Sequence, residues 1–164
     1  MSYSTGEALL LTQVQATSAY STTNTSRSDW TMLKKGKSNT YAILRYGGFP
    51  SHAQSSLGGI GGSIKYDTNW ITICEIWVRV GTTETLALTT LETNMQQIIA
   101  KFDARRKAAD AGSVIRDVRV ASGAEPQGQW KTDKRGNVIG TGPKWLKQDL
   151  RIVWTEENTV TLLE

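Results

Sequence analysis

The chain of 164 residues carries a net charge of +4, and 38% of its residues are hydrophobic and 21% charged. This length suits one compact domain that buries a core without disulfides or metal, so we expect residues 1–164 to form a single domain. No stretch approaches the roughly 18 apolar residues of a membrane span. No basic region followed by an apolar segment opens the sequence, so neither membrane insertion nor secretion is indicated.

The N-terminal segment predicts one helix followed by a long loop. Residues 6–19 place apolar side chains at spacings compatible with a short helix. Residues 17–39 are rich in Ser, Thr, Asn and Lys and predict a connection that touches the body through an apolar patch around Trp30.

A short strand and a second long loop follow. Residues 40–46 are typical of a strand, and Gly47 and Gly48 are expected to end it. Residues 47–65 contain the run GGIGG and predict a loop that is flexible in the isolated subunit, because glycine is costly to order. A loop of this length is commonly functional or disordered.

The longest β-type run is WITICEIWVRV at residues 70–80. Alternate side chains of a strand point to opposite faces of a sheet, so this run has two faces. One face is nearly apolar and consists of Trp70, Thr72, Cys74, Ile76, Val78 and Val80. The other face is mixed and consists of Ile71, Ile73, Glu75, Trp77 and Arg79. We expect a central strand whose first face meets the core helix and whose second face is covered by the N-terminal segment or by another subunit.

The next segment has the clearest helical pattern. Apolar residues recur at steps of three and four at Leu88, Leu91, Met95, Ile98 and Phe102. Thr89 and Glu92 match a capping box, which predicts that the helix begins near Thr89. A coiled-coil seam is the alternative interpretation, but three turns of pattern favour a helix that faces the core.

The C-terminal part predicts two strands and an arm. Residues 113–122 alternate valines with charged residues and predict a strand. Residues 121–143 contain the turn sequence DKRGN at 133–137 and predict a projecting hairpin or arm. Residues 144–155 alternate apolar and polar side chains and predict the last strand, which a tail at 156–164 follows. The predicted order is helix, strand, strand, helix, strand, strand: an α+β fold with a mainly antiparallel four-stranded sheet packed by two helices.

Residues that could carry chemistry are few and poorly placed for it. His52 is the only histidine and lies in the flexible loop, whereas a catalytic base must be held and oriented. Cys74 lies mid-strand on the apolar face, which is typical of a buried thiol and unlike a nucleophile. The run GGIGGSIK lacks the Gly-Lys-Ser/Thr ending of a phosphate loop. We therefore expect no catalytic residue, no cofactor and no metal site, and hence no enzyme.

Two groups of residues are candidates for contact with partners. The first is a protein interface made by the apolar residues of the second face and by two tryptophans in the loops, namely Ile71, Ile73, Trp77, Trp30 and Trp130. The second group contains the basic residues of the predicted arm, Lys131, Lys134 and Arg135, which could contact DNA electrostatically and without sequence specificity.

The order of elements, the size, the glycine-rich loop between strands and the basic arm before the last strand resemble the tail terminator (tail completion) proteins of long-tailed bacteriophages. The resemblance spans residues 6–155 and includes no short motif, so it transfers no functional position. It implies a structural virion protein: a homohexameric ring that caps the tail tube, stops tube polymerisation and forms the head–tail joining surface. The implied partners are further copies of the chain, the tail tube protein, a head–tail connector protein and DNA in the lumen. The implied location is the tail or neck, after assembly in the host cytoplasm.

Two other functions stay open. A basic module that binds single-stranded nucleic acid is favoured if Trp30 and Trp130 lie on the same face as the lysines, because exposed aromatic rings stack on bases. A different ring of the phage neck or baseplate is the alternative within the structural class.

Overall fold

The structure is a computed structural model that describes residues 3–56, 63–107, 115–122, 126–140 and 142–161. Within these residues the helices are α1 (Tyr3–Gln15), α2 (Met32–Lys35) and α3 (Glu84–Lys107). The strands are β1 (Thr25–Arg27), β2 (Thr40–Ser56), β3 (Ser63–Arg79), β4 (Ile115–Ser122), β5 (Gln127–Gln129), β6 (Lys131–Thr132), β7 (Val138–Ile139) and β8 (Trp145–Thr161). The chain therefore has the α+β architecture that the sequence predicts.

Six strands form a mixed sheet in the order β1-β2-β3-β8-β4, with β5 paired to the first residues of β8. Strands β2, β3, β8 and β4 are the four that the sequence predicts, and they form its antiparallel centre. The predicted sheet is too small, because β1 and β5 are three-residue strands in polar segments that resemble loops. It is also not purely antiparallel, since β1 runs parallel to β2.

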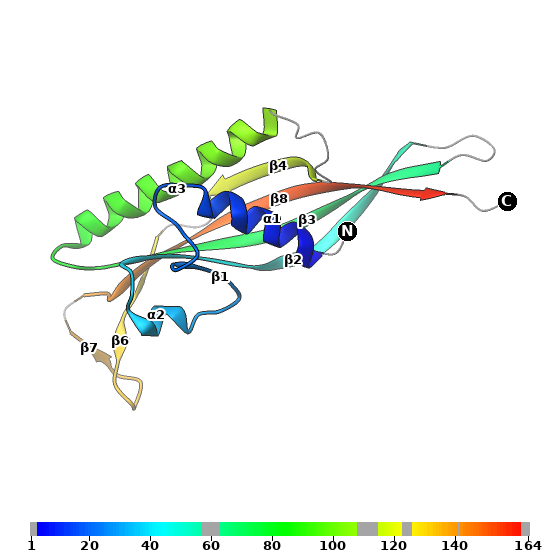
Figure 1. The fold of residues 1–164 in the computed structure, drawn as a ribbon. Coiled ribbons are helices and arrows are strands. Elements are labelled where there is room, and N and C mark those ends of the chain that lie inside the picture. The colour runs from blue at the N-terminus through cyan, green and yellow to red at the C-terminus, as the bar shows by residue number, and fades with distance from the viewer. Residues whose placement is uncertain (1–2, 57–62, 108–114, 123–125, 141, 162–164) are drawn as a thin grey trace.

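The sheet separates a large helical layer from a small one. Helices α1 and α3 cover one face, and α2 lies on the opposite side (Figure 1). The predicted apolar face of β3 belongs to the core, where the side chains of Thr72, Cys74 and Ile76 are fully buried. Their partners in register on β8 include Leu150 and Ile152, which are also fully buried. Burial of such side chains is the main favourable contribution to folding.

Both long helices make close contact with this core. The predicted stripe of α3 is confirmed, because Leu91, Ile98 and Phe102 are at most 1% exposed. Helix α1, which begins three residues and ends four residues before the predicted bounds, passes directly over the ring of Trp154. A Cβ atom on Gly6 would lie 2.0 Å from Trp154 Cη2, so only glycine permits this approach.

The start of α3 differs from the prediction. The helix begins at Glu84, one turn before Thr89. The Thr83 hydroxyl accepts a hydrogen bond from the backbone N–H of Leu86 (3.3 Å) and so caps the helix. The Thr89 hydroxyl instead donates to the Thr85 carbonyl oxygen (3.1 Å) inside the helix, which makes the predicted capping box wrong.

Strands β2 and β3 extend into the segment 47–65, where the sequence predicts a loop. Strand β2 continues to Ser56 and β3 begins at Ser63, and the two pair along this extension. Strand β8 pairs with β3 as far as Thr161, so most of the predicted tail is strand. Residues 51–56, 63–69 and 155–161 thus form a three-stranded arm that projects from the helix-covered body (Figure 1).

Two glycines bend β2 where the sequence predicts its end. Gly48 has φ +150°, a conformation that favours glycine, and the register with β3 shifts on both sides of it. The glycines therefore make a bulge within the strand, and pairing with β3 resumes at Ser51. The sequence predicts a loop because glycine is costly to order, and cross-strand pairing overrides this local signal.

The segment 121–143 contains the projecting hairpin that its turn sequence predicts. Strands β6 and β7 pair, and the backbone N–H of Asp133 donates to the Asn137 carbonyl oxygen (2.9 Å). The Asp133 carboxylate accepts hydrogen bonds from the backbone N–H groups of Arg135 and Asn137, and Gly136 adopts φ +86°. Residues 130–140 are called the hairpin below. In the described ranges, no helix is long and apolar enough to cross a membrane.

Candidate functional site: the second face of the sheet

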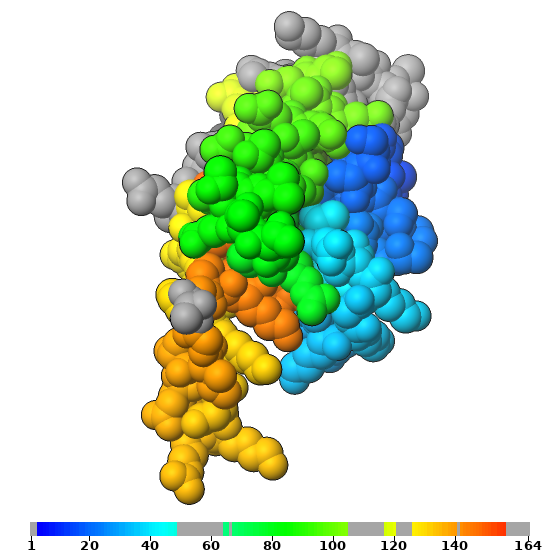
Figure 2. Space-filling model, turned by 90° about the vertical axis from the view of Figure 1, so that its left-hand side faces the viewer, coloured from blue at the N-terminus to red at the C-terminus, as the bar shows by residue number. Residues whose placement is uncertain are grey.

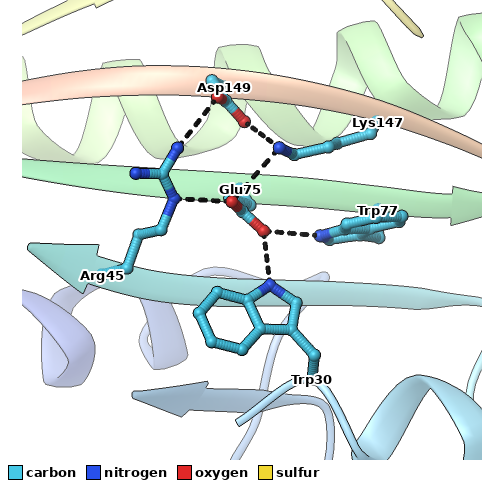
Figure 3. A network of polar contacts seen from close by, with 6 residues as sticks. All are labelled: Trp30, Arg45, Glu75, Trp77, Lys147 and Asp149. Carbon is cyan, nitrogen blue, oxygen red and sulfur yellow. Dashed lines mark hydrogen bonds and ion pairs between the residues drawn. The ribbon is translucent and has the colours of Figure 1, made fainter. Parts of the chain in front are cut away.

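The sheet face opposite α1 and α3 has a buried carboxylate at its centre, surrounded by four donors (Figure 3). Glu75 lies in the middle of β3, and its side chain is 5% exposed. Its Oε1 accepts a hydrogen bond from Arg45 Nε on β2 (2.6 Å) and lies 3.1 Å from Lys147 Nζ on β8. Its Oε2 accepts hydrogen bonds from the indole N–H groups of Trp30 (2.7 Å) and Trp77 (3.2 Å).

A second carboxylate balances the charges of this cluster. Asp149 on β8 lies 3.4 Å from Arg45 Nη2 and 3.2 Å from Lys147 Nζ. The ammonium of Lys147 therefore lies between the two carboxylates, at 3.1 Å from Glu75 Oε1 and 3.2 Å from Asp149 Oδ1. The lysine ammonium also lies 5.6 Å from the centroid of the Trp77 ring, a favourable cation–π distance. The two positive charges of Arg45 and Lys147 therefore balance the two negative charges of Glu75 and Asp149. These four residues with Trp30 and Trp77 are called the Glu75 cluster.

The cluster keeps Glu75 ionised. Burial by itself raises the pKa of Glu75, but hydrogen bonds from Trp30, Arg45 and Lys147 outweigh it and lower the pKa below its ordinary value. Both carboxylate oxygens are occupied by donors, so neither is available to take a proton from a substrate. The arrangement acts as a clamp that ties the segment carrying Trp30 onto the sheet.

The Glu75 cluster and the segment that carries Trp30 cover one half of the second face. Tyr41 and Ile43 point to this face from β2, and they are 1% and 0% exposed. The expectation that the N-terminal segment covers the second face is therefore confirmed for this half.

No described helix or loop covers the other half of the face. Ile71 and Ile73 of β3 and Val153 of β8 are only half-buried there. The isoleucines lie against the backbone of β2, since a Cβ atom on Gly47 would be 2.7 Å from Ile71 Cγ2 and 3.0 Å from Ile73 Cγ1. A shallow depression of about 450 Å³ occupies this half, lined by Asn69, Ile71, Asp117, Arg119, Arg151, Val153 and Thr155.

The five predicted interface residues separate into two locations. Ile71, Ile73 and Trp77 project from β3 onto the second face, and Trp30 joins them through its hydrogen bond to the same carboxylate as Trp77. Trp30 is still 40% exposed. Trp130 lies apart from them at the base of the hairpin, where it is 47% exposed.

The hairpin also carries the predicted DNA-facing residues. Lys131, Lys134 and Arg135 are all exposed. Val138 and Ile139 on the returning strand are 59% and 44% exposed, which is unusual for large apolar side chains in one short element. Trp130 therefore lies beside the predicted DNA-facing residues, whereas the indole of Trp30 is hydrogen-bonded to Glu75 on the second face.

The one cysteine and the one histidine of the sequence lie at distant positions in the sheet, so they form no thiol–imidazole pair. Cys74 is fully buried, as expected, and burial raises the pKa of its thiol to about 12. Cys74 pairs in register with Leu44, whereas His52 pairs with Thr68, six residues away along β3. Six residues of strand span roughly 20 Å. Among the described residues, no group of three or more His, Cys, Asp or Glu could hold a metal ion.

Alternation along β3 predicts that Glu75 and Trp77 lie on the second face, but it does not predict the cluster that joins them. The available signal was a glutamate in a strongly apolar strand, which must find partners when buried. Arg45, Lys147 and Asp149 stand on outward positions of neighbouring strands, yet only the register shows that they meet at Glu75.

The sequence matches no protein-family model. It also matches no curated protein.

Proposed function

We propose that this chain is a structural subunit that assembles with copies of itself into a closed ring and performs no catalysis. The three-stranded arm carries the proposal, because both of its outer strands have unpaired edges. On one side, β1 pairs with β2 only at residues 42–44. On the other side, pairing of β4 with β8 stops at Glu156. The described strands therefore leave the edges of β2 and β8 open along the arm.

Open strand edges are templates for pairing with another chain. The two edges of the arm are different surfaces, since one belongs to β2 and the other to β8. A contact between the β2 edge of one copy and the β8 edge of the next is consequently head-to-tail, and such contacts build rings when the rotation closes. The half-buried Ile71, Ile73 and Val153 lie on the sheet face beside the arm and offer additional apolar area to a neighbour.

The order of the main elements, the three-stranded arm and the hairpin support the resemblance to phage tail terminators. In this proposal the ring contains six subunits, caps the tail tube, stops its polymerisation and offers the surface for head–tail joining. The tail tube protein and a connector protein are then its partners, and the virion tail or neck is its location.

Cysteine cross-linking across the arm tests the head-to-tail contact. Gln54 and Asn158 stand in the same row of the arm, on either side of Tyr66 of β3. Two strand spacings separate them by roughly 10 Å. This exceeds the Cα separation of about 4.4 to 6.8 Å that a disulfide needs, so a bond between the two positions joins different copies. The buried thiol of Cys74 does not interfere.

We expect the Gln54→Cys/Asn158→Cys protein to form a ladder of covalent oligomers on oxidation that ends at the ring size, expected to be six. Light scattering should give the same size for the unmodified chain, and negative-stain images should show rings. Each single-cysteine variant should stop at the dimer. The pair Glu92→Cys/Arg119→Cys, at exposed positions outside the arm, should give no ladder. A chain that stays monomeric at high concentration and on tail tubes refutes the proposal.

A further inference from the structure

The net positive charge of the protein is concentrated at one end of the sheet, opposite the arm. Backbone hydrogen bonds bring four segments together there. The N–H of Arg79 donates to the Asn39 carbonyl oxygen (2.8 Å), and the N–H of Val80 donates to the Lys144 carbonyl oxygen (3.0 Å). The N–H of Lys144 in turn donates to the Gln129 carbonyl oxygen (2.8 Å). The start of β2, the end of β3, the start of β8 and the end of β5 are therefore neighbours.

Each of these four segments carries a cation at or next to this sheet end. Arg79 and Lys144 belong to the hydrogen-bonded row itself, Lys37 lies two residues before Asn39, and Lys131 lies two residues after Gln129. All four side chains are exposed. With strands about 4.8 Å apart, three spacings spread the row over roughly 14 Å.

Two elements extend this row on either side. Helix α2 brings Lys34 and Lys35, and the turn of the hairpin brings Lys134 and Arg135, all exposed. Figure 2 looks onto this end of the molecule. The hairpin (yellow and orange) projects downward at the lower left, and the segment around α2 (cyan) lies at the lower right of the body. None of these eight cations forms an ion pair with a described residue. We call them the cationic end.

The charge balance is uneven across the molecule. Three carboxylates, Asp29, Glu84 and Asp133, belong to the same segments as the eight cations, which leaves +5 at the cationic end. The whole chain carries +4, so all other residues together carry −1. The Asp133 carboxylate is already engaged by the backbone of its own turn, and that of Asp29 by the backbone and hydroxyl of Thr31. The field at this end is therefore positive.

We infer that the cationic end binds the phosphate backbone of nucleic acid without reading its sequence. Six of the eight cations are lysines, which are depleted at protein–protein interfaces, whereas surfaces that bind nucleic acid are rich in positive charge. Their exposure lets each cation reach a phosphate and release a counterion. Binding of this kind does not depend on ring formation, so the inference goes beyond the proposed function.

Salt titrations of the full chain with two probes, poly-dT and a random-sequence duplex, test the inference. We expect both probes to bind and the logarithm of the binding constant to fall linearly with the logarithm of salt concentration. The variant Lys134→Gln/Arg135→Gln should reduce the poly-dT slope by about 1.4, since each lost contact is worth about 0.7. The variant Lys34→Gln/Lys35→Gln should reduce it by a similar amount, because helix and hairpin share one surface.

The matched control removes two charges from the second face instead. Arg119 and Arg151 are exposed and line the depression beyond Ile73, far along β8 from Lys144, so Arg119→Gln/Arg151→Gln should keep the full slope. An equal loss in the control would overturn the inference, since the binding would then follow total charge. Binding of polyglutamate without binding of either DNA probe would overturn it as well and assign this end to an acidic protein.

The molar mass of each variant separates this inference from the proposed function. A monomeric chain that shows the expected slopes supports the cationic end and refutes the ring. A ring that binds neither probe at low salt overturns the cationic end and leaves the ring intact.

Discussion

Replacement of Glu75 by glutamine removes one negative charge from the Glu75 cluster and leaves the size of the side chain nearly unchanged. The carboxylate accepts from Arg45 and Lys147 on one oxygen and from Trp30 and Trp77 on the other. A glutamine side chain has one oxygen and one NH₂ group. In either orientation its NH₂ group faces two donors, so one pair of hydrogen bonds is lost and the cluster acquires an unbalanced positive charge.

The cost follows from the burial of the partners. Breaking a buried ion pair from one side destabilises a protein by about 3 to 5 kcal/mol. The side chains of Arg45 and Asp149 are 34% and 33% exposed, so water screens part of the unbalanced charge. Lys147, at 18%, is less well solvated. We therefore expect Glu75→Gln to lower the free energy of unfolding by about 2 to 3 kcal/mol at neutral pH.

The pH dependence gives a second readout with a defined sign. The pKa of Glu75 is lower in the folded protein than in the unfolded chain. Its contribution to stability is therefore complete above the unfolded value, near 4.5, and is lost as the pH falls through the lower folded-state pKa. The difference between wild type and Glu75→Gln should narrow in that acidic window, because glutamine does not titrate.

Urea denaturation monitored by circular dichroism and tryptophan fluorescence measures both effects, at one fixed protein concentration because assembly shifts the apparent stability. Glu92→Gln is the matched control, since Glu92 is exposed on α3, and it should change the free energy of unfolding by less than about 0.5 kcal/mol. A loss below about 1 kcal/mol for Glu75→Gln, or a difference that is constant down to acidic pH, would show that the cluster is not a clamp.

Three further experiments test the packing of α1, the burial of Cys74 and the role of Trp130. Gly6→Ala places a Cβ atom against the Trp154 ring and should lower the free energy of unfolding by about 1 to 3 kcal/mol in thermal or urea unfolding. Gly81→Ala is the control and should be nearly neutral, because the space around Gly81 is open. Equal effects of the two substitutions would disprove the close approach of Gly6 to the ring. Cys74 should resist thiol reagents at pH 8 in the folded protein and react on unfolding, since burial raises its pKa to about 12, and rapid labelling of the native chain would contradict its burial. Trp130→Ala should impair assembly, measured by light scattering, and leave the affinity for DNA nearly unchanged. If the variant instead assembles normally and loses roughly 1 to 3 kcal/mol of affinity for single-stranded DNA, the protein is a stacking module and the tail-terminator interpretation is wrong.

The core of the fold could be predicted because strand alternation and helical spacing are visible within short stretches of sequence. The two faces of β3 and the inward stripe of α3 follow directly from side-chain periodicity, and the structure confirms both. The hairpin was also predictable, since the turn sequence from Asp133 to Asn137 has a specific backbone geometry.

The arm and the Glu75 cluster were not predictable for one shared reason, which is that pairing between distant segments creates them. Nothing local makes residues 51–56 a strand, and they become one because β3, which pairs with β8 along its other edge, offers them a partner. Likewise, Trp30 looks like an isolated aromatic residue of a polar loop until the parallel pairing of β1 with β2 carries its segment to the sheet. Register over long sequence separations is not encoded in any short window.

The position of β3 between β2 and β8 has a consequence for the order of folding. Strand β3 can pair with β2 as soon as both are synthesised, but its other edge waits for β8, whose first residue Trp145 is 66 positions after Arg79. At synthesis rates of about 5 to 20 residues per second, the nascent chain exposes an unpaired and apolar strand edge for about 3 to 13 s. The contacts that complete the sheet are long-range, up to Ser63 with Thr161, so folding should be slow and finish after translation. During that interval the central strand is open to pairing with another nascent copy, and such an edge favours aggregation.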